Sequence, residues 1–337
     1  MARRLRQSGR RGRRGKSWSP DEPGHDLPVT KEGEDADQAV AEAGKRTTSR
    51  RDLSRNENFE QISPEVGELD EAALDEAMQN SPDETLGLLA DLTGATDPKL
   101  RELARRLAGR LMLELGNRGR ARPRGIGKIV EQPYRPDGGD IDIDASLEAI
   151  TESRRGQAID PERLRLRGWQ KPGTAFCLLL DRSGSMGGQP LATNAVATAA
   201  IASRNPDDYS VIAFGKDVVV TKSQDVPKSS DRVINDVLTL RGHGTTDLAG
   251  ALLVARQQLS RSRAGRKVAI LLSDCRATVE GDAENAAHGM DELVVIAPEE
   301  DHDEAKAFAA RVGARLALVG GPSEIPEVLA RVLEPIA

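Results

Sequence analysis

Aromatic residues are scarce in this chain of 337 residues, since Phe, Trp and Tyr together make up only 2% of it. A packed core must therefore be built from Leu, Val, Ile and Ala, and few aromatic faces exist on which nucleic-acid bases could stack. No run of 18 apolar residues occurs, so the sequence predicts no membrane-spanning helix. The basic N-terminus is not followed by an apolar segment, so we expect no signal peptide.

Cysteine is almost absent as well, with only Cys177 and Cys275 in the chain. Secreted scaffolds usually carry more cysteines, so we expect a cytoplasmic protein. No Cys or His spacing is typical of a zinc site, and both cysteines are expected to be free thiols near the sheet.

Histidine is limited to four residues, which leaves little material for a hydrolase. His243 and His288 are the candidate bases, and Ser185 lies in a Ser-Gly-Ser-Met-Gly segment that lacks the first glycine of a nucleophile elbow. Residues 9–17 end in Gly-Lys-Ser, but the leading glycine is one residue too far away for a phosphate-binding loop and no strand precedes it. We therefore expect neither a hydrolase nor an ATP site, and predict a protein that is not an enzyme.

Charge is plentiful but unevenly distributed around a net value of −6. Residues 1–16 contain seven Arg and one Lys, and a cluster of acidic residues follows at 32–37. With so little periodic apolar content, residues 1–60 are predicted to be a disordered charged tail. The basic start could contact nucleic acid electrostatically, but no nucleic-acid-reading fold accompanies it, so nucleic-acid binding stays an alternative that we do not favour.

The pattern becomes helical over residues 61–118, with apolar side chains at helical spacing. Asp97 and Pro98 are typical of a helix start, and Gly116 suits the end of the same helix. We predict a small helical module whose apolar faces pack against each other or against another surface.

Residues 119–170 are predicted to be a linker with a short strand and a short helix, the helix covering 145–153. Ala145 and Thr151 stand where a calcium-binding EF-hand loop needs Gly and Glu. Ile141 and Ile143 are instead expected to form a buried strand face with the acids outside, although the acidic face could also dock a partner or reach a metal site of the same chain. Three acids alternate here with the two isoleucines: Asp140, Asp142 and Asp144.

From residue 171 to residue 337 strand-like and helix-like segments alternate. Residues 175–180 form a continuous apolar run, which is typical of a strand covered on both faces. Repeated strand–helix units predict an α/β domain with a doubly wound, mostly parallel sheet and helices on both sides. The expected strands are 175–180, 209–214, 218–221, 267–272, 292–296 and 315–319, with a hairpin joining the second and third.

Oxygen-bearing side chains follow two of these strands and one further loop, at the sheet edge where such folds bind ligands. Two carboxylates and three hydroxyls are hard ligands that suit Mg²⁺, or Mn²⁺, and carry little negative charge of their own. A metal held in this way stays electrophilic, so an acidic group of a partner protein can fill its open position. The five predicted metal-site residues are Asp181, Ser183, Ser185, Thr246 and Asp274, with Thr245 as the fallback for Thr246.

Asp-x-Ser-x-Ser, Thr-Asp-Leu-x-x-Ala-Leu and apolar-apolar-Ser-Asp occur in this order and together resemble the metal-ion-dependent adhesion site of von Willebrand factor A domains. The resemblance covers about half of the chain. It implies that Ser183, Ser185 and Thr246 contact the metal directly and that Asp181 and Asp274 act largely through water.

The segment Leu271–Ala277 resembles the magnesium chelatase D subunit, except that Cys275 replaces the usual glycine. Residues 1–130 are too short for the AAA+ module of that subunit, and the layout is more similar to proteins of the CoxE and MoxR-associated kind. The resemblance implies an adaptor that links a MoxR- or chelatase-type AAA+ ATPase to an acidic client protein. A D-like subunit of a metal chelatase is the alternative.

Overall fold

The computed structural model describes residues 29–118, 128–133, 140–147, 150–151, 164–170, 173–182, 188–242, 244–279 and 281–334. The basic start at 1–16 and three predicted residues, Ser183, Ser185 and His243, lie outside these ranges. Among the described helices, none is both long and apolar enough to cross a membrane.

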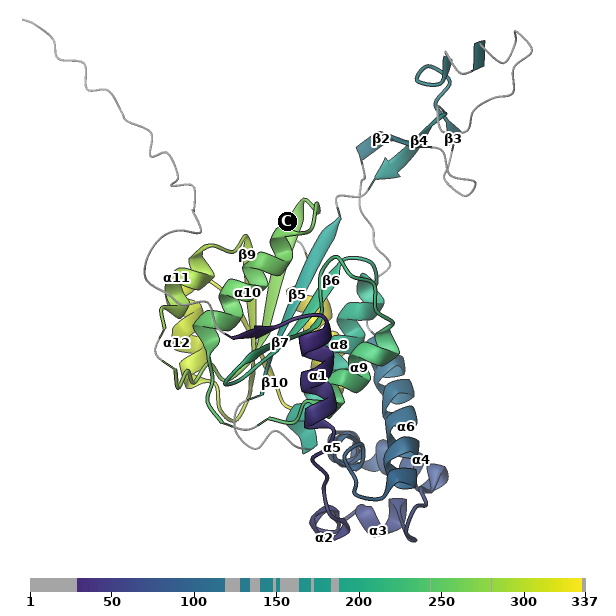
Figure 1. Ribbon diagram of the computed structural model, residues 1–337, viewed down its shortest axis with the longest axis vertical. Coiled ribbons are helices and arrows are strands. Elements are labelled where there is room, and N and C mark those ends of the chain that lie inside the picture. The colour runs from purple at the N-terminus through teal and green to yellow at the C-terminus, as the bar shows by residue number, and fades with distance from the viewer. Residues whose placement is uncertain are drawn as a thin grey trace, which may run out of the picture.

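A seven-stranded sheet forms the centre of the α/β domain (Figure 1). Every strand pair in it is parallel except β6 with β7, which form the predicted antiparallel hairpin. The predicted α/β fold with a mostly parallel sheet is therefore confirmed. In sheet order the strands are β1 (Thr30–Lys31), β7 (Val218–Lys222), β6 (Tyr209–Phe214), β5 (Thr174–Asp181), β8 (Arg266–Leu272), β9 (Glu292–Pro298) and β10 (Arg315–Val319).

Helices cover both faces of this sheet, which explains why β5 is apolar from Ala175 to Leu180. Successive side chains of a strand point to opposite faces, so Leu178 and Leu180 pack in one hydrophobic cluster and Cys177 and Leu179 in the other. The first face carries α8 (Gly188–Arg204), α9 (Ser230–Thr239) and α13 (Ile325–Val332) with the short helix η2 (Pro322–Glu324), and the second carries α10 (Leu248–Ser260), α11 (Ala283–His288) and α12 (Asp303–Val312).

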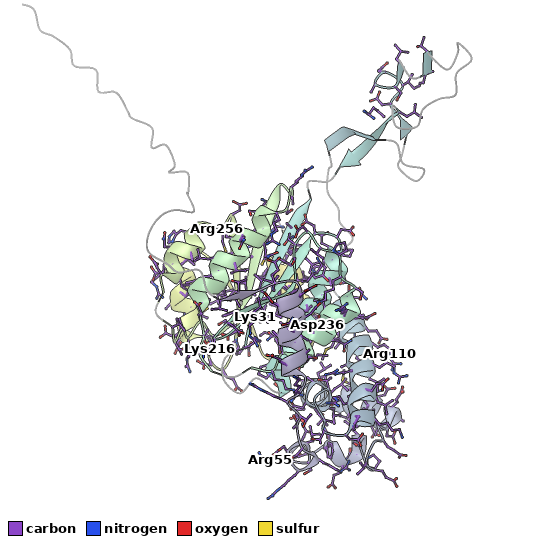
Figure 2. The ribbon with its side chains drawn as sticks, viewed as in Figure 1. Lys31, Arg55, Arg110, Lys216, Asp236 and Arg256 are labelled. Atoms are coloured by element: carbon purple, nitrogen blue, oxygen red, sulfur yellow. The ribbon has the colours of Figure 1, made fainter. Side chains whose placement is uncertain are left out.

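A further layer of helices packs on the outside of α8 (Figure 1). Its members are α2 (Arg50–Leu53), α3 (Phe59–Ile62), α4 (Glu71–Asn80), α5 (Pro82–Leu92) and α6 (Pro98–Gly116). Leu89 of α5 and Met112 of α6 are buried in the same cluster as Leu178 of the sheet. Charged side chains such as Arg55 and Arg110 lie on the exposed side of the layer (Figure 2). The helices at 61–118 therefore pack both on each other and on the α/β domain, and share one core with it.

The prediction of a disordered tail over 1–60 was wrong for residues 29–60. β1 pairs with β7, and α1 (Glu34–Ala43) packs Ala36 against Ala213 and Val219 of the sheet. α1 buries only small side chains, so its sequence lacks the broad apolar stripe from which a helix is usually predicted. The helix is buried by residues far away in the sequence, Ala213, Val219 and Leu240.

Glu32 fastens this segment to the domain. Its carboxylate accepts hydrogen bonds from Arg261 (Nη2 to Oε2, 2.9 Å), Ser223 (2.6 Å) and Gln258 (3.2 Å). The hydrogen bond from Arg261 is the main reason that the pKa of Glu32 is lowered from 4.5 to about 2. A carboxyl whose pKa is lower in the folded state stabilises the fold above pH 4.5, and this contribution is lost as the pH falls from 4.5 towards 2.

We expect Glu32→Gln to lower the free energy of unfolding at pH 7 by about 1 kcal/mol, because water partly screens this half-exposed pair. Glutamine can still accept from Ser223 but forms no ion pair with Arg261. The stability difference between variant and natural protein should shrink as the pH is lowered below 4.5, which urea unfolding at several pH values measures. Glu42→Gln, at an exposed position of α1, is the matched control. A difference that does not change with pH would contradict the ion-pair argument.

Residues of the predicted linker form a separate antiparallel sheet, β2 (Lys128–Pro133), β4 (Arg165–Gln170) and β3 (Asp140–Ile141). The expected alternation there was wrong, because Asp142 is buried at 4% exposure while Ile143 is 66% exposed. The strand ends at 141, and Asp142 accepts a hydrogen bond from the Ala145 N–H (3.2 Å), which turns the chain. The predicted helix at 145–153 lies partly outside the described residues.

Candidate metal centre

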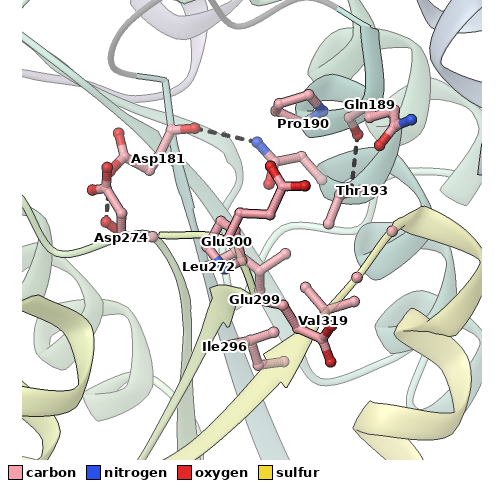
Figure 3. Close-up of a pocket in the computed structure, with 15 residues that line it drawn as sticks. Asp181, Gln189, Pro190, Thr193, Leu272, Asp274, Ile296, Glu299, Glu300 and Val319 are labelled. Atoms are coloured by element: carbon pink, nitrogen blue, oxygen red, sulfur yellow. Dashed lines mark hydrogen bonds between the residues drawn. The ribbon is translucent and has the colours of Figure 1, made fainter. Parts of the chain in front are cut away.

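Two of the predicted carboxylates come from neighbouring strands at the same edge of the sheet. Asp181 is the last residue of β5, and Asp274 follows β8 by two residues. The two strands run parallel, with Leu180 opposite Leu272, so their carboxyl ends coincide. Figure 3 shows Asp181 and Asp274 at the same end of one pocket. This is the edge at which open α/β sheets bind ligands.

Asp181 is held in a fixed position. It is buried at 6% exposure, and its Oδ2 accepts a hydrogen bond of 2.6 Å from the Ser273 hydroxyl. The Ser273 oxygen in turn accepts from the Cys275 N–H at 2.8 Å, and the Asn194 amide of α8 donates to the Asp181 carbonyl at 3.2 Å.

The chain bends sharply behind Asp274. Cys275 has a φ of 61°, and it is the one non-glycine residue with positive φ among the residues that the structure describes. This conformation costs about 1–2 kcal/mol for a residue other than glycine. Glycine, which the sequence comparison with the chelatase D subunit led us to expect at this position, would avoid that cost. The bend lets the Arg276 N–H donate to Asp274 Oδ1 at 3.0 Å and leaves that carboxylate partly exposed in the pocket.

Thr246 reaches the same edge from the loop before α10. The loop is fixed by hydrogen bonds from the Asp247 N–H to the Gly215 carbonyl (3.0 Å) and from the Thr246 N–H to the Thr278 hydroxyl (2.7 Å). Gly215 follows β6, next to β5, and Thr278 follows Asp274. The loop therefore lies between the two chain segments that flank the carboxylates.

Among the residues that the structure describes, none forms a hydrogen bond with the buried hydroxyl of Thr246. Thr246 is 1% exposed, whereas the neighbouring Thr245 is exposed. Leaving a buried hydroxyl unsatisfied costs about 1–3 kcal/mol, so a native structure rarely keeps one unless something else binds it. Of the two threonines considered from the sequence, Thr246 is therefore the one whose hydroxyl is buried.

The donor set fits a hard divalent cation. Asp181, Asp274 and Thr246 offer only oxygen atoms, as Mg²⁺ and Mn²⁺ prefer. Ser183 and Ser185, the other two predicted ligands, lie outside the described residues. Within the described ranges no group of three or more His, Cys, Asp and Glu side chains could hold a metal ion. A metal here must therefore rely on hydroxyls as well as on the two carboxylates.

The cysteines do not compete as ligands or nucleophiles. Both are free and buried, as the sequence predicts. Burial raises the pKa of the Cys177 thiol to about 12, and burial together with the nearby Asp274 and Asp181 carboxylates raises that of Cys275 to about 12. The thiolate is the metal-binding and nucleophilic form, so neither cysteine supplies it near neutral pH.

Arg182, the residue after Asp181, forms an ion pair with Asp217. The Arg182 guanidinium donates to Asp217 at 2.8 Å, and Lys31 of β1 pairs with the same carboxylate at 2.7 Å. Burial would raise the pKa of Asp217, but the hydrogen bond from Lys31 and the charge of Arg182 outweigh it and hold this pKa below its usual range. Arg182 is thus engaged with Asp217.

A pocket of about 350 Å³ opens beside the two carboxylates. Ile296 and Val319 contribute apolar surface to it, and Glu299 and Glu300 lie along another part of its wall (Figure 3). We did not predict these two glutamates from the sequence. They directly follow β9, so the rule that selected Asp274 could also have selected them.

One family model matches part of the chain. Residues 176–276 match the family model of the von Willebrand factor type A domain. A search of curated proteins gives no match.

Solved structures of low sequence identity resemble about half of the chain. A von Willebrand factor type A protein from Catenulispora acidiphila is 16% identical, with a TM-score of 0.38, over 50% of this chain and 43% of its own. The manganese-loaded TRAP protein of Plasmodium vivax is 17% identical (TM-score 0.39; 47% and 72% covered). BatB of Bacteroides thetaiotaomicron is 16% identical (TM-score 0.37; 47% and 96% covered).

A further similar structure is the mussel byssus protein PTMP1. This chain spans 46% of the length of PTMP1 and 43% of the length of the Catenulispora acidiphila protein. The matched family segment carries Asp181, Thr246 and Asp274. The part of the α/β domain that contains these residues is therefore similar to the von Willebrand factor type A domain.

Proposed function

We propose that this protein is a non-catalytic adaptor that binds an acidic group of a partner protein through a divalent cation, Mg²⁺ or Mn²⁺. The residues that would hold the cation are Asp181, Ser183, Ser185, Thr246 and Asp274. The observation that carries the proposal is the buried hydroxyl of Thr246, which has no hydrogen-bond partner among the described residues and lies in a loop bonded to Thr278, four residues after Asp274. A bound cation would supply a positive charge with an open coordination position.

The residues of the proposed site differ in charge and in role. Thr246 offers a neutral oxygen, so the site carries no more than the two negative charges of Asp181 and Asp274. Ser273 orients the Asp181 carboxylate through its short hydrogen bond, as residues around metal ligands commonly do. The weakly charged donor set leaves part of the cation's charge for a carboxylate of the partner.

Isothermal titration of Mg²⁺ and Mn²⁺ into the purified chain tests the metal site. We expect the natural protein to take up one ion and Asp181→Asn to bind it about 10- to 100-fold more weakly. Asparagine keeps an oxygen that accepts from Ser273, so the domain should remain folded. Asp207→Asn, an exposed carboxyl before β6 at the opposite edge of the sheet, should bind like the natural protein. Absence of metal uptake by the natural protein would sink the proposal.

We further propose a MoxR- or chelatase-type AAA+ ATPase and an acidic client as partners. The support is the resemblance of Leu271–Ala277 to the chelatase D subunit and the helical segment before the α/β domain. Affinity purification of the tagged chain, once with Mg²⁺ and once with EDTA, followed by mass spectrometry, should recover the ATPase only with the metal. Recovery of tetrapyrrole-synthesis enzymes would favour the alternative, a D-like subunit of a metal chelatase. Equal capture with and without EDTA would contradict the adaptor mechanism.

A further inference from the structure

The helical layer touches the α/β domain at the metal centre through α5. Asp91, in the last turn of α5, accepts a hydrogen bond of 2.9 Å from the backbone N–H of Gly188. Gly188 begins α8, the helix whose Asn194 donates to the Asp181 carbonyl. Gly188 has a φ of +57°, a conformation that favours glycine. Asp91 therefore fixes the end of α8 that lies nearest to Asp181.

The same end of α5 holds the loop that carries Thr246. Arg241, five residues before Thr246, donates through Nη2 to the carbonyl oxygens of Asp91 (2.7 Å) and Ala90 (3.2 Å). Its Nη1 donates to the Thr48 hydroxyl at 2.7 Å and lies 3.7 Å from Asp91 Oδ1. A cation at the carboxyl end of a helix is favourable because the last carbonyl groups carry partial negative charge.

α5 approaches this region too closely for any larger residue at position 87. A Cβ on Gly87 would lie 2.9 Å from the backbone nitrogen of Gln189 and 3.1 Å from the carbonyl carbon of Gly188. At its other end α5 reaches η2, where Asp83 accepts from the Ser323 N–H at 2.8 Å. Gln189 lines the pocket beside the carboxylates. The helix is thus in direct contact with several segments that surround the candidate metal centre.

We propose that Asp91 is a positioning residue for the metal centre, through which the helical layer sets the affinity of the α/β domain for its cation. Asp91 need not touch the metal, because it contacts both Gly188, at the start of the helix that holds Asp181 through Asn194, and Arg241, five residues before Thr246. Coupling between two sites is reciprocal, so metal binding also stabilises the docking of α5. This inference rests on the proposed function, since it requires that a metal binds at this edge.

Isothermal titration of Mn²⁺ into the full chain, compared between variants, tests the proposal. Asp91→Ala removes both the acceptor for Gly188 and the charge beside Arg241, and should weaken Mn²⁺ binding about 10-fold. Asp91→Asn keeps an acceptor for the Gly188 N–H and should restore most of the affinity. Asp75→Ala, an exposed acid on α4, is the matched control and should bind like the natural protein.

Hydrogen exchange gives a readout that does not depend on activity. The Gly188 amide should exchange faster in metal-free Asp91→Ala than in the natural protein, and added Mn²⁺ should slow the exchange of α5 in the natural protein. If Asp91→Ala does not fold, Arg241→Lys decides, because the single nitrogen of lysine cannot occupy the positions of both Nη1, which bonds Thr48, and Nη2, which bonds the two carbonyl oxygens. An unchanged Mn²⁺ affinity in the folded variants overturns the role of Asp91 and leaves the proposed function standing. No Mn²⁺ uptake by the natural protein overturns both.

Discussion

Replacing Thr246 with valine should leave the metal-free protein at least as stable as the natural one, yet remove much of its stabilisation by Mg²⁺. The Thr246 hydroxyl has no hydrogen-bond partner in the described part of the chain, so its loss breaks no hydrogen bond there and removes a buried polar atom that costs about 1–3 kcal/mol. Both backbone groups of Thr246 bond to the 278–279 segment and are retained in the variant. Only an interaction with a bound cation is lost.

The size of the effect follows from linkage. A ligand at 100 times its Kd stabilises the folded state by about 2.7 kcal/mol, and a tenfold loss of affinity reduces this to about 1.4 kcal/mol. Urea unfolding in EDTA and in saturating Mg²⁺ measures both states of each variant. Thr245→Val, at the exposed neighbouring position, should keep the full gain. If Thr246→Val were several kcal/mol less stable in EDTA, the hydroxyl would have a partner within the protein and the main support for the metal centre would disappear.

The strands of the α/β domain could be predicted because their signal is local. β5 is apolar at almost every position, as a strand covered on both faces must be, and the hairpin of β6 and β7 follows from two short apolar runs around Gly215. The positions of Asp181 and Asp274 followed from topology, since the carboxyl ends of neighbouring parallel strands meet. The burial of Thr246 required the loop contacts to Gly215 and Thr278, which no local pattern reveals.

The N-terminal segment shows where such patterns fail. β1 is two residues long, and α1 presents Ala36, Ala39 and Val40 in place of a broad apolar stripe. What keeps the segment folded is a groove over β6 and β7 and the hydrogen bonds of Glu32 to side chains about 190 to 230 residues away. A charge-rich composition correctly indicates that the segment has little tendency to fold by itself. It does not show which distant residues of the chain the segment contacts.

Gly116 illustrates a residue whose role was only half predicted. It ends α6, as expected from the sequence, but it also lies directly against the backbone of α8. A Cβ there would be 2.6 Å from the Ala200 nitrogen and 2.7 Å from the Ala199 carbonyl carbon. α8 itself is rich in buried alanines, which leaves room for two helices to pack at such close range.

A matched pair of glycine substitutions in α6 should therefore change stability in opposite directions. Gly109→Ala places its Cβ where no atom lies within 4 Å and should stabilise the protein by about 0.5–1 kcal/mol, the helix preference of alanine over glycine. Gly116→Ala gains the same preference but forces α6 away from α8, and overpacking of this kind costs about 1–3 kcal/mol. Thermal unfolding should show a melting temperature raised by about 1–4 °C for the first variant and lowered for the second. Stabilisation by both would mean that α6 does not pack against α8, and that the helical layer is not held on the α/β domain at this contact.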